Sequence, residues 1–466
     1  MKTRIEHDLL GEKEVPADAY YGIQTLRGIE NFQNISGITI GDYPNYVKAL
    51  AMVKWAAAKA NQELEILPDD IANAITRACE EIIGGKLHDQ FPVDLIQGGA
   101  GTSTNMNINE VVANRALELM GHQKGEYQYC HPNNHVNMSQ STNDAYPTSF
   151  KLAFIFMNEE LVADLKLLIQ AFRAKGEEFK EVLKMGRTQL QDAVPMTMGQ
   201  EFEAFAANLE EEVDRLNQMA KLFLEVNMGA TAIGTGINSE PEYSSKCIKN
   251  LRIISGEEFV LASNLIEATP DAGSSVMYSS ALKRLAVKLS KICNDLRLLS
   301  SGPRCGLNEI NLPGSSIMPG KVNPVIPEVV NQICYRIIGN DLTVTFAAEA
   351  GQLQLNVMEP VMVHAIFSSI KMLQKGMDRL RILCVEGITA HTQHCREMVL
   401  NSIGIVTALN PTLGYENSSR IAKRALKENR SVYDLVLEEG LLTKDELDQL
   451  LKPESMIKPH KFYKKK

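Results

Sequence analysis

The sequence lacks two signals of export or membrane insertion. No apolar run reaches the roughly 18 residues that a membrane-spanning helix needs. The opening residues, MKTRIEHDLLGEKEV, mix both charge signs and show no apolar core of a secretory signal peptide. The chain also has no excess of positive charge, since its formal net charge is -9. This balance disfavours nucleic acid and anionic membrane surfaces as partners.

Paired cysteines and metal-ligand spacings are missing as well. The eight cysteines are scattered without a CxxC pair, which indicates reduced thiols in a cytoplasmic protein and disfavours a disulfide framework or a zinc site. The nine histidines include no HExxH spacing. His391 and His394 lie three residues apart beside Cys395, so a metal site stays open there, although a surface helix is favoured.

The middle of the chain shows a clear helical periodicity. With 466 residues, 44% of them hydrophobic, the chain can bury a large core and suggests about three domains. Apolar residues recur at spacings of three and four within 161–179, 202–223 and 282–299. Each stripe buries one face of a helix, so we expect an all-α fold with a long central helix bundle. Periodicity fits a bundle within one subunit and a bundle shared between subunits equally well.

Four segments combine glycine, serine, threonine and asparagine in ways that core packing does not explain. They are GGAGTSTN (98–105), STND (141–144), MGRTQLQD (185–192) and GSSIMPGKVNP (314–324). The first joins glycines, which permit close ligand approach, to hydroxyl and amide donors, but such turns are also common in ordinary loops. The last is a loop with two serines, a lysine and an asparagine, the set that a mobile loop over a substrate would need.

The segment 141–144 has two interpretations. Its residue types are favoured at helix N-caps, where they satisfy unpaired backbone N–H groups. A helix N-terminus also suits an anion, because it presents N–H groups and a partial positive charge. The segment alone does not decide between these roles.

Seven ordered blocks resemble the fumarase/aspartase superfamily. The loop 314–324 is similar to the motif that the superfamily shares. The other six blocks are DLLGEKEVPADAYYGIQTLR (8–27), GGAGTSTNMNINEVVANRALE (98–118), QSTNDAYPT (140–148), GRTQLQDAVPMTMGQEF (186–202), GPRCGLNEINLP (302–313) and GQLQLNVMEPV (351–361). Together they extend over nearly the whole chain.

Within the superfamily the sequence resembles aspartases more than class II fumarases. NPVIPEVVNQ (323–332) and GQLQLN (351–356) are similar to aspartase, and Gln189 stands where fumarases generally place a histidine that helps activate water. The resemblance therefore implies elimination of ammonia from L-aspartate to give fumarate. One departure is that Pro313 joins Gly314 directly, where aspartases usually have several more residues.

The resemblance also implies an architecture and an assembly. It predicts an N-terminal helical domain (1–140), a central helix bundle (141–393) and a small C-terminal domain (394–466). The superfamily's bundles form the core of a homotetramer whose sites are shared between subunits. The resemblance implies no organic cofactor. Aspartases often respond to a divalent metal such as magnesium, for which this sequence shows no ligand cluster.

Finally, the resemblance implies roles for individual residues. Removing a proton from the carbon beside the side-chain carboxylate creates a dianionic enediolate, which neutral donors aimed at the new charge can stabilise. Ser315 would be the general base, an alkoxide whose pKa the loop lowers through backbone donors and Lys321. The binding residues would be Thr102, Ser141, Thr142 and Ser316 for the enediolate, Lys321 and Asn323 for the α-carboxylate, and Asn143, Thr188 and Gln189 around the amino group.

Other interpretations stay open. His131 or His135, which flank the 140–148 block, could act as the base, although a structural role is favoured. The chain could instead be a class II fumarase, or a non-catalytic member comparable to the lens crystallins related to argininosuccinate lyase. The presence of Ser315, Lys321 and Asn323 argues against a non-catalytic role, because a scaffold would not require them.

Overall fold

The structure is a computed structural model that describes residues 2–314, 318 and 320–457. The chain divides into two compact units. The first takes in the described residues up to Val162 together with Asp214–Arg284 and Arg336–Met372. The second takes in Ala163–Val213, Leu285–Tyr335 and the described residues from Leu373 onward. The three predicted sequence domains stay a prediction, because these units divide the long helices themselves.

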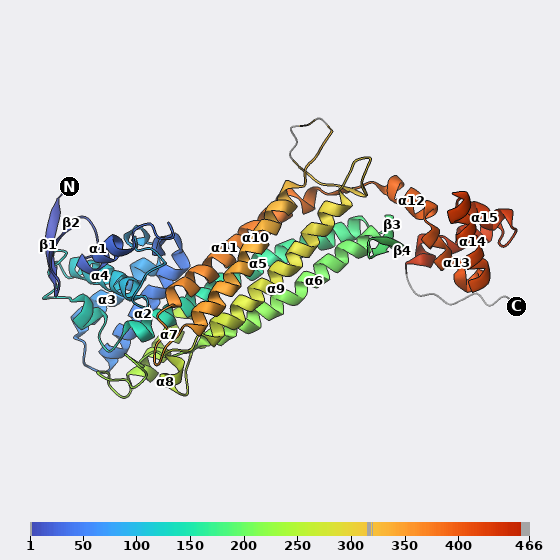
Figure 1. Cartoon of the computed structure of the whole chain (residues 1–466). Helices are drawn as coiled ribbons and strands as arrows, with labels where there is room; N and C mark the ends of the chain where they lie inside the picture. Colours follow the sequence, from blue (N-terminus) through green and yellow to red (C-terminus); the bar gives the residue numbers. More distant parts are fainter. Residues whose placement is uncertain (1, 315–317, 319, 458–466) are drawn as a thin grey trace. The chain divides into compact units, whose positions relative to one another are not determined.

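Five long helices, labelled in Figure 1, dominate the middle of the chain. Each of them contributes residues to both units. They are α5 (Thr142–Glu178), α6 (Met198–Ala220), α9 (Gly273–Leu299), α10 (Val325–Glu349) and α11 (Glu359–Leu383). The apolar stripes predicted from the sequence fall mainly on α5, α6 and α9, which confirms the helical interpretation of these stretches. No helix in the described part of the chain is long and apolar enough to cross a membrane.

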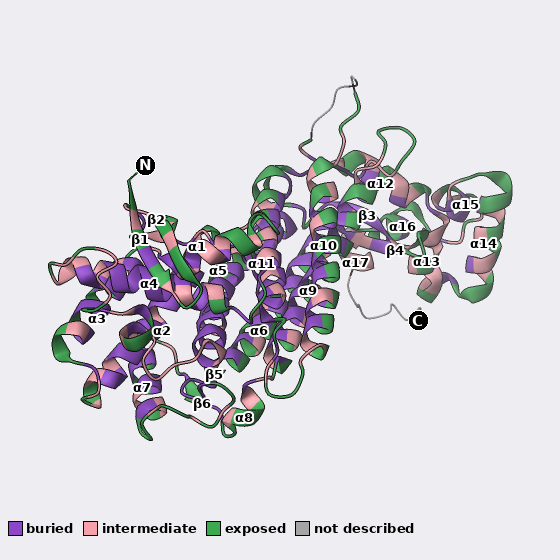
Figure 2. Ribbon diagram, turned by 60° about the vertical axis from the view of Figure 1, so that its left-hand side comes forward, coloured by how far each residue is buried: buried purple, intermediate pink, exposed green. Residues whose placement is uncertain are grey.

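The first unit also holds the shorter elements within residues 3–136 and 221–268. Besides its shares of the long helices it contains β1 (Thr3–Asp8), β2 (Gly11–Pro16), α1 (Ile23–Phe32), η1 (Ile40–Asp42), α2 (Pro44–Glu63), α3 (Asp69–Ile83), η2 (His88–Gln90), α4 (Thr102–Leu119), η3 (Pro132–Val136), η4 (Lys221–Leu224), β5 (Glu225–Val226), α7 (Tyr243–Ser255), β6 (Val260–Leu261) and α8 (Leu265–Ala268). Helix α2 packs against both α3 and α7, and its many buried alanines permit this close approach. Figure 2 shows the buried residues that run along α2, α3 and α4.

Helices of the bundle meet in this unit through buried polar and aromatic contacts. Ser279 Oγ of α9 donates to Asp341 Oδ1 of α10 at 2.9 Å. Phe154 of α5 packs edge-on against Phe367 of α11, with ring centroids 5.2 Å apart. The predicted bundle is therefore present here as packed neighbouring helices (Figure 1).

The second unit holds the remaining short elements. They are β3 (Leu183–Thr188), β4 (Gln191–Thr197), β7 (Ile310–Asn311), η5 (Val385–Gly387), β8 (Thr389–Ala390), α12 (Thr392–Asn401), η6 (Ile403–Ile405), α13 (Val406–Leu413), α14 (Tyr415–Glu428), α15 (Val432–Glu438), α16 (Lys444–Leu450) and α17 (Pro453–Met456). Strands β3 and β4 form an antiparallel hairpin, which was not predicted from the sequence. Leu183 and Met185 of β3 belong to one buried apolar cluster with residues of the C-terminal helices, so those helices support the hairpin.

Candidate active site

Two helix N-termini of the first unit carry four of the predicted binding residues. Helix α4 begins at Thr102 and α5 begins at Thr142. Gly101 precedes α4 with a φ of 85°, and a Cβ at this position would lie 2.5 Å from the ring of Tyr146 in the second turn of α5. Asn105 Nδ2 of α4 also donates to Thr142 Oγ1 at 3.1 Å. The two predicted segments, far apart in sequence, are therefore brought together at their helix starts.

The hydroxyl groups of these two turns have different partners. Thr102 Oγ1 donates to the carbonyl of Gly99 at 2.7 Å. Ser141 Oγ accepts from the backbone N–H of Asn143 at 3.2 Å, which is the predicted capping role. Thr142 Oγ1 accepts from Asn105, so its own proton is directed elsewhere. Ser141 thus caps α5, while the Thr142 hydroxyl and the N-terminus of the same helix can still face an anion.

A buried carboxylate holds the start of α5 against a loop of the same unit. Asp144 accepts the backbone N–H groups of Gly229 at 3.1 Å and of Thr231 at 2.9 Å. Burial raises the pKa of Asp144 to about 6, although these backbone donors oppose the shift. Asn143 Nδ2 donates to the carbonyl of Ala232 at 2.8 Å, so this predicted binding residue is tied to the same loop.

A buried lysine lies behind the two helix starts. Lys54 of α2 is 1% exposed, and its Nζ donates to Asn105 Oδ1 at 2.7 Å, Gln140 Oε1 at 2.7 Å and Asn137 Oδ1 at 3.1 Å. Burial lowers the pKa of this lysine to about 7, and the charge of Asp144 partly opposes that effect. Lys54 was not predicted as a site residue; its signal in the sequence is a single lysine within the apolar stretch AMVKWAAA (51–58).

The tip of the β3–β4 hairpin carries the next two predicted residues, and it belongs to the second unit. Thr188 ends β3 and pairs with Gln191, while Gln189 and Leu190 form the turn with φ values of 54° and 61°. Thr188 and Gln189 are exposed. Their side chains are thus presented at a surface by a short, defined turn.

The loop after β7 carries the remaining predicted residues. Ser315 and Ser316 lie outside the described residues, so their predicted roles stay predictions. Lys321 is exposed, and its backbone N–H donates to the carbonyl of Met318 at 3.1 Å. Asn323 is half-buried two residues before the start of α10, and its carbonyl accepts from the backbone N–H of Val325 at 2.9 Å.

The histidines considered as alternatives make structural contacts. His131 Nδ1 accepts from the backbone N–H of Asn133 at 3.0 Å, and His135 Nδ1 accepts from the N–H of His131 at 2.9 Å. Burial lowers the pKa of both rings. These bonds stabilise the turn at η3, which supports the structural interpretation.

The His391–Cys395 region contains the predicted surface helix, α12. His391 Nδ1 bonds to the carbonyl of Asn308 at 2.8 Å, and His394 Nε2 bonds to that of Leu307 at 2.9 Å. Cys395 is buried, with its thiol on the carbonyl of Glu309 at 3.6 Å. Among the described residues no three His, Cys, Asp or Glu side chains are grouped so that they could hold a metal ion.

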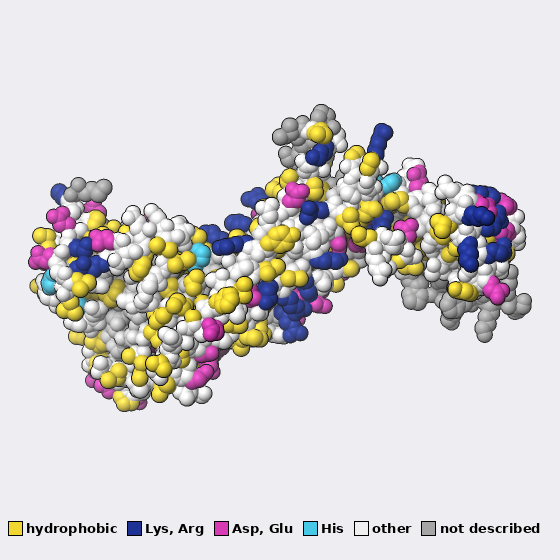
Figure 3. All heavy atoms as spheres, viewed as in Figure 1, with side chains coloured by type: hydrophobic (Ala, Val, Ile, Leu, Met, Phe, Trp, Pro, Cys, Tyr) yellow, Lys and Arg dark blue, Asp and Glu magenta, His cyan; other side chains and the backbone are white. Residues whose placement is uncertain are grey.

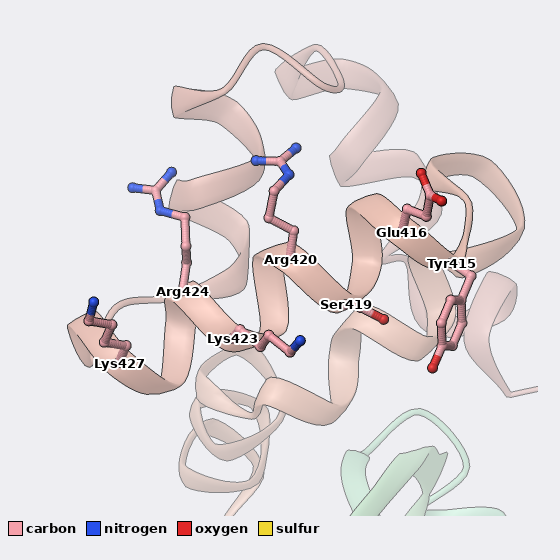
Figure 4. A pocket seen from close by; sticks show the side chains of 7 residues that line it. All are labelled: Tyr415, Glu416, Ser419, Arg420, Lys423, Arg424 and Lys427. Carbon is pink, nitrogen blue, oxygen red and sulfur yellow. The ribbon is translucent and has the colours of Figure 1, made fainter.

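A basic hollow on the surface lies along α14, away from the predicted residues in sequence. Figure 3 shows Lys and Arg side chains gathered over this helix, and Figure 4 shows those that line the hollow. The lining residues are Tyr415, Glu416, Ser419, Arg420, Lys423, Arg424 and Lys427. Arg420 and Arg424 both pair with Glu439, which offsets part of the positive charge. None of the predicted site residues lines it.

Comparison with known proteins identifies the family to which the chain belongs. The chain matches a protein family described as Lyase over residues 11–339, and one described as Fumarase C C-terminus over residues 405–458. It is 63% identical to an aspartate ammonia-lyase of Pseudomonas aeruginosa, across 98% of this chain and 97% of that one. It is 58% identical to an aspartate ammonia-lyase of Helicobacter pylori, across 99% of this chain and 100% of that one.

Solved structures agree in fold. A fumarate lyase:delta crystallin from Brucella melitensis, bound to cobalt, superposes with a TM-score of 0.95 at 55% identity, covering 98% of this chain and 100% of that one. A class II fumarase from Schistosoma mansoni superposes with a TM-score of 0.91 at 34% identity, covering 99% and 100%. The chain is therefore a lyase of the fumarase/aspartase superfamily and belongs with its aspartases.

Proposed function

We propose that the protein eliminates ammonia from L-aspartate to give fumarate, and that the reaction is reversible. The structural observation that carries this proposal is the junction of α4 and α5, where Asn105 orients the Thr142 hydroxyl beside two helix N-termini. Such a junction suits a dicarboxylate that gains negative charge during the reaction. The aspartate ammonia-lyases that share 58–63% of its sequence support the choice of substrate.

In the proposed first step, the Ser315 alkoxide removes a proton from the carbon beside the side-chain carboxylate. The electron pair moves onto that carboxylate and forms the dianionic enediolate. Ser141, Thr142 and Ser316 would donate to it, as would Thr102 once its hydroxyl turns from the Gly99 carbonyl. Such donors lower the barrier because they bind the enediolate more strongly than the starting carboxylate.

In the second step the electron pair returns to form the carbon–carbon double bond of fumarate, and the carbon–nitrogen bond breaks. Ammonia leaves from the region of Asn143, Thr188 and Gln189. Lys321 and Asn323 would hold the α-carboxylate throughout, as a cation and an amide two residues apart.

We further propose a homotetramer whose sites combine residues from several subunits. The predicted residues lie on separate short segments, at two helix starts, one hairpin tip and one loop. Helix α10 also exposes a row of large apolar side chains, Ile338, Leu342 and Phe346, with Phe346 65% exposed. An apolar row at helical spacing is suited to burial against another helix.

A cytoplasmic location is supported by the eight cysteines, which are all described and all unpaired. Activation by a divalent metal such as magnesium stays a prediction, and we assign no step of the reaction to a metal or to an organic cofactor.

The reverse reaction tests the proposal. Purified protein incubated with fumarate and ammonium should form L-aspartate, measured by chiral chromatography. Formation of L-malate in place of L-aspartate would identify a hydratase of the fumarase type. Neither product from a correctly assembled protein would favour a non-catalytic role.

A further inference from the structure

A fully buried carboxylate joins two segments of the second unit that carry predicted site residues. Glu309 is 0% exposed and lies directly before β7. Its Oε1 is 2.6 Å from the Arg187 guanidinium, and its Oε2 is 2.9 Å from Lys184 Nζ. Both cations belong to β3, the strand that ends at Thr188. The contact therefore connects the β3–β4 hairpin with the residues that lead into the loop 314–324.

The backbone around Glu309 is held just as firmly. The N–H of His391 donates to the carbonyl of Glu309 at 2.9 Å, and the N–H of Glu309 donates to the carbonyl of Leu299 at 2.9 Å. The next two residues, Ile310 and Asn311, pair with β8. Glu309 is thus a fixed point from which the following loop extends.

Close packing also fixes the residues that follow Glu309, up to the two ends of the loop 314–324. Pro313 packs so tightly against Gly387 that a Cβ at position 387 would overlap the proline ring. Gly314 lies against the other end of the same loop, where an added Cβ would be 2.6 Å from the carbonyl oxygen of Asn323. The two ends of the loop therefore meet at its base, and Asn323 lies on it.

We propose that Glu309 is a positioning residue that holds the hairpin tip with Thr188 and Gln189, and the loop base with Asn323, in one fixed arrangement. This inference rests on the proposed function. Attraction within a buried ion pair is largely offset by the cost of removing both charges from water, so its net contribution to stability is small. Its effect on geometry is larger, because Arg187 and Lys184 of one strand both lie against the Glu309 carboxylate. Lys184 also donates to Glu201 at 2.5 Å, so Arg187 carries the greater part of this contact.

The test replaces Glu309 by its neutral isostere. Glu309→Gln should lower kcat/KM for L-aspartate by on the order of 10²-fold, the size expected when substrate-positioning groups move by about 1 Å. Glu212→Gln is the matched control. Glu212 is also 0% exposed, and its Oε1 lies 2.6 Å from Lys288 Nζ, but this ion pair joins α6 to α9. The control should lose stability and keep its kcat/KM.

A second variant and a second measurement keep the inference testable if Glu309→Gln folds poorly. Arg187→Gln leaves the Lys184–Glu309 pair in place and should lower kcat/KM in the same direction but less. Hydrogen–deuterium exchange should increase together in 183–191 and 310–313 in both variants, and in neither segment of Glu212→Gln. Hydrogen–deuterium exchange does not depend on turnover. An inactive parent protein would therefore contradict the proposed function, while the positioning role of Glu309 could still be measured. Unchanged kcat/KM, or faster exchange in one segment alone, would overturn the inference.

Discussion

The side-chain amide of Asn105 donates to the hydroxyl oxygen of Thr142 across 3.1 Å, and its carbonyl oxygen accepts from Lys54 at 2.7 Å. Asn105 is in the first turn of α4 and Thr142 begins α5, so one side chain fixes two helix starts against each other. The direction of the Thr142 hydroxyl in the proposed site thus depends on a residue that is itself 2% exposed.

Asn105→Ala tests this relationship. Without the amide, the Thr142 hydroxyl can rotate, and kcat/KM for L-aspartate should fall about tenfold or more, because a misaligned donor stabilises the enediolate less. Asn107→Ala is the control: Asn107 is 0% exposed in the same helix and donates to the carbonyl of Gln90 at 3.0 Å. The control should be destabilised without a loss of kcat/KM. Equal losses of kcat/KM in both variants would show that the loss comes from disturbing α4 as a whole, and not from the Asn105–Thr142 hydrogen bond.

The buried Lys54 predicts a pH dependence of stability. Its pKa is lowered from 10.5 to about 7, so between these values the unfolded chain binds a proton that the folded chain does not. The free energy of unfolding therefore gains up to about 1.4 kcal/mol per pH unit from this group as the pH rises. Lys54→Met lacks this gain, and its stability relative to the parent should decrease from about pH 7.5 to about pH 9.5 in denaturant titrations. A difference that is constant with pH would contradict the prediction.

Ser315→Ala tests the proposed base. The variant should keep its assembly and helix content and still bind a substrate-like dicarboxylate through Lys321 and the α4–α5 donors. Its turnover should fall by on the order of 10²-fold or more, the lower range for loss of a positioned general base. Ser316→Ala should lose less, because it removes one donor among several. If Ser315→Ala still exchanges the substrate proton with solvent deuterium at the parent rate, the base lies elsewhere and His135 is the next residue to replace.

Sites shared between subunits predict complementation. Thr188→Val and Lys321→Ala subunits, unfolded and refolded together, should form some sites that lack both lesions. Activity should reappear in the mixture and stay absent when either variant is refolded alone. Verified mixed tetramers without activity, or a monomer in sedimentation, would argue for sites within one subunit.

The helices could be predicted from the sequence because their apolar residues face one side at a regular spacing. The stripe predicted within 282–299, for example, lies on α9. The β3–β4 hairpin could not be predicted in this way, because its turn uses Gln189 and Leu190 at positive φ where asparagine and glycine are the usual signal. In sequence, 185–192 is a polar segment that core packing does not explain, and nothing in it indicates two paired strands.

The residues that support the site escaped prediction for a different reason. Lys54, Asp144 and Glu309 are charged residue types that are usually exposed. Only Lys54 stands in an apolar stretch that indicates burial, and nothing comparable in the sequence marks the other two. Their partners are distant along the chain: Lys54 bonds to Asn105, 51 residues away, and Glu309 pairs with Arg187, 122 residues away. The residues proposed to contact the substrate occur in recognisable sequence blocks, whereas those proposed to position them come together only in the folded chain.

The most direct test of the central claim compares two substrates on the same preparation. Purified protein is incubated separately with L-aspartate and with L-malate, and fumarate is followed by its ultraviolet absorbance. The 323–332 and 351–356 segments and Gln189 predict a clearly higher kcat/KM for L-aspartate, with ammonia released in equal amount to fumarate. Faster turnover of L-malate, without release of ammonia, would contradict the account and assign the protein to the fumarases.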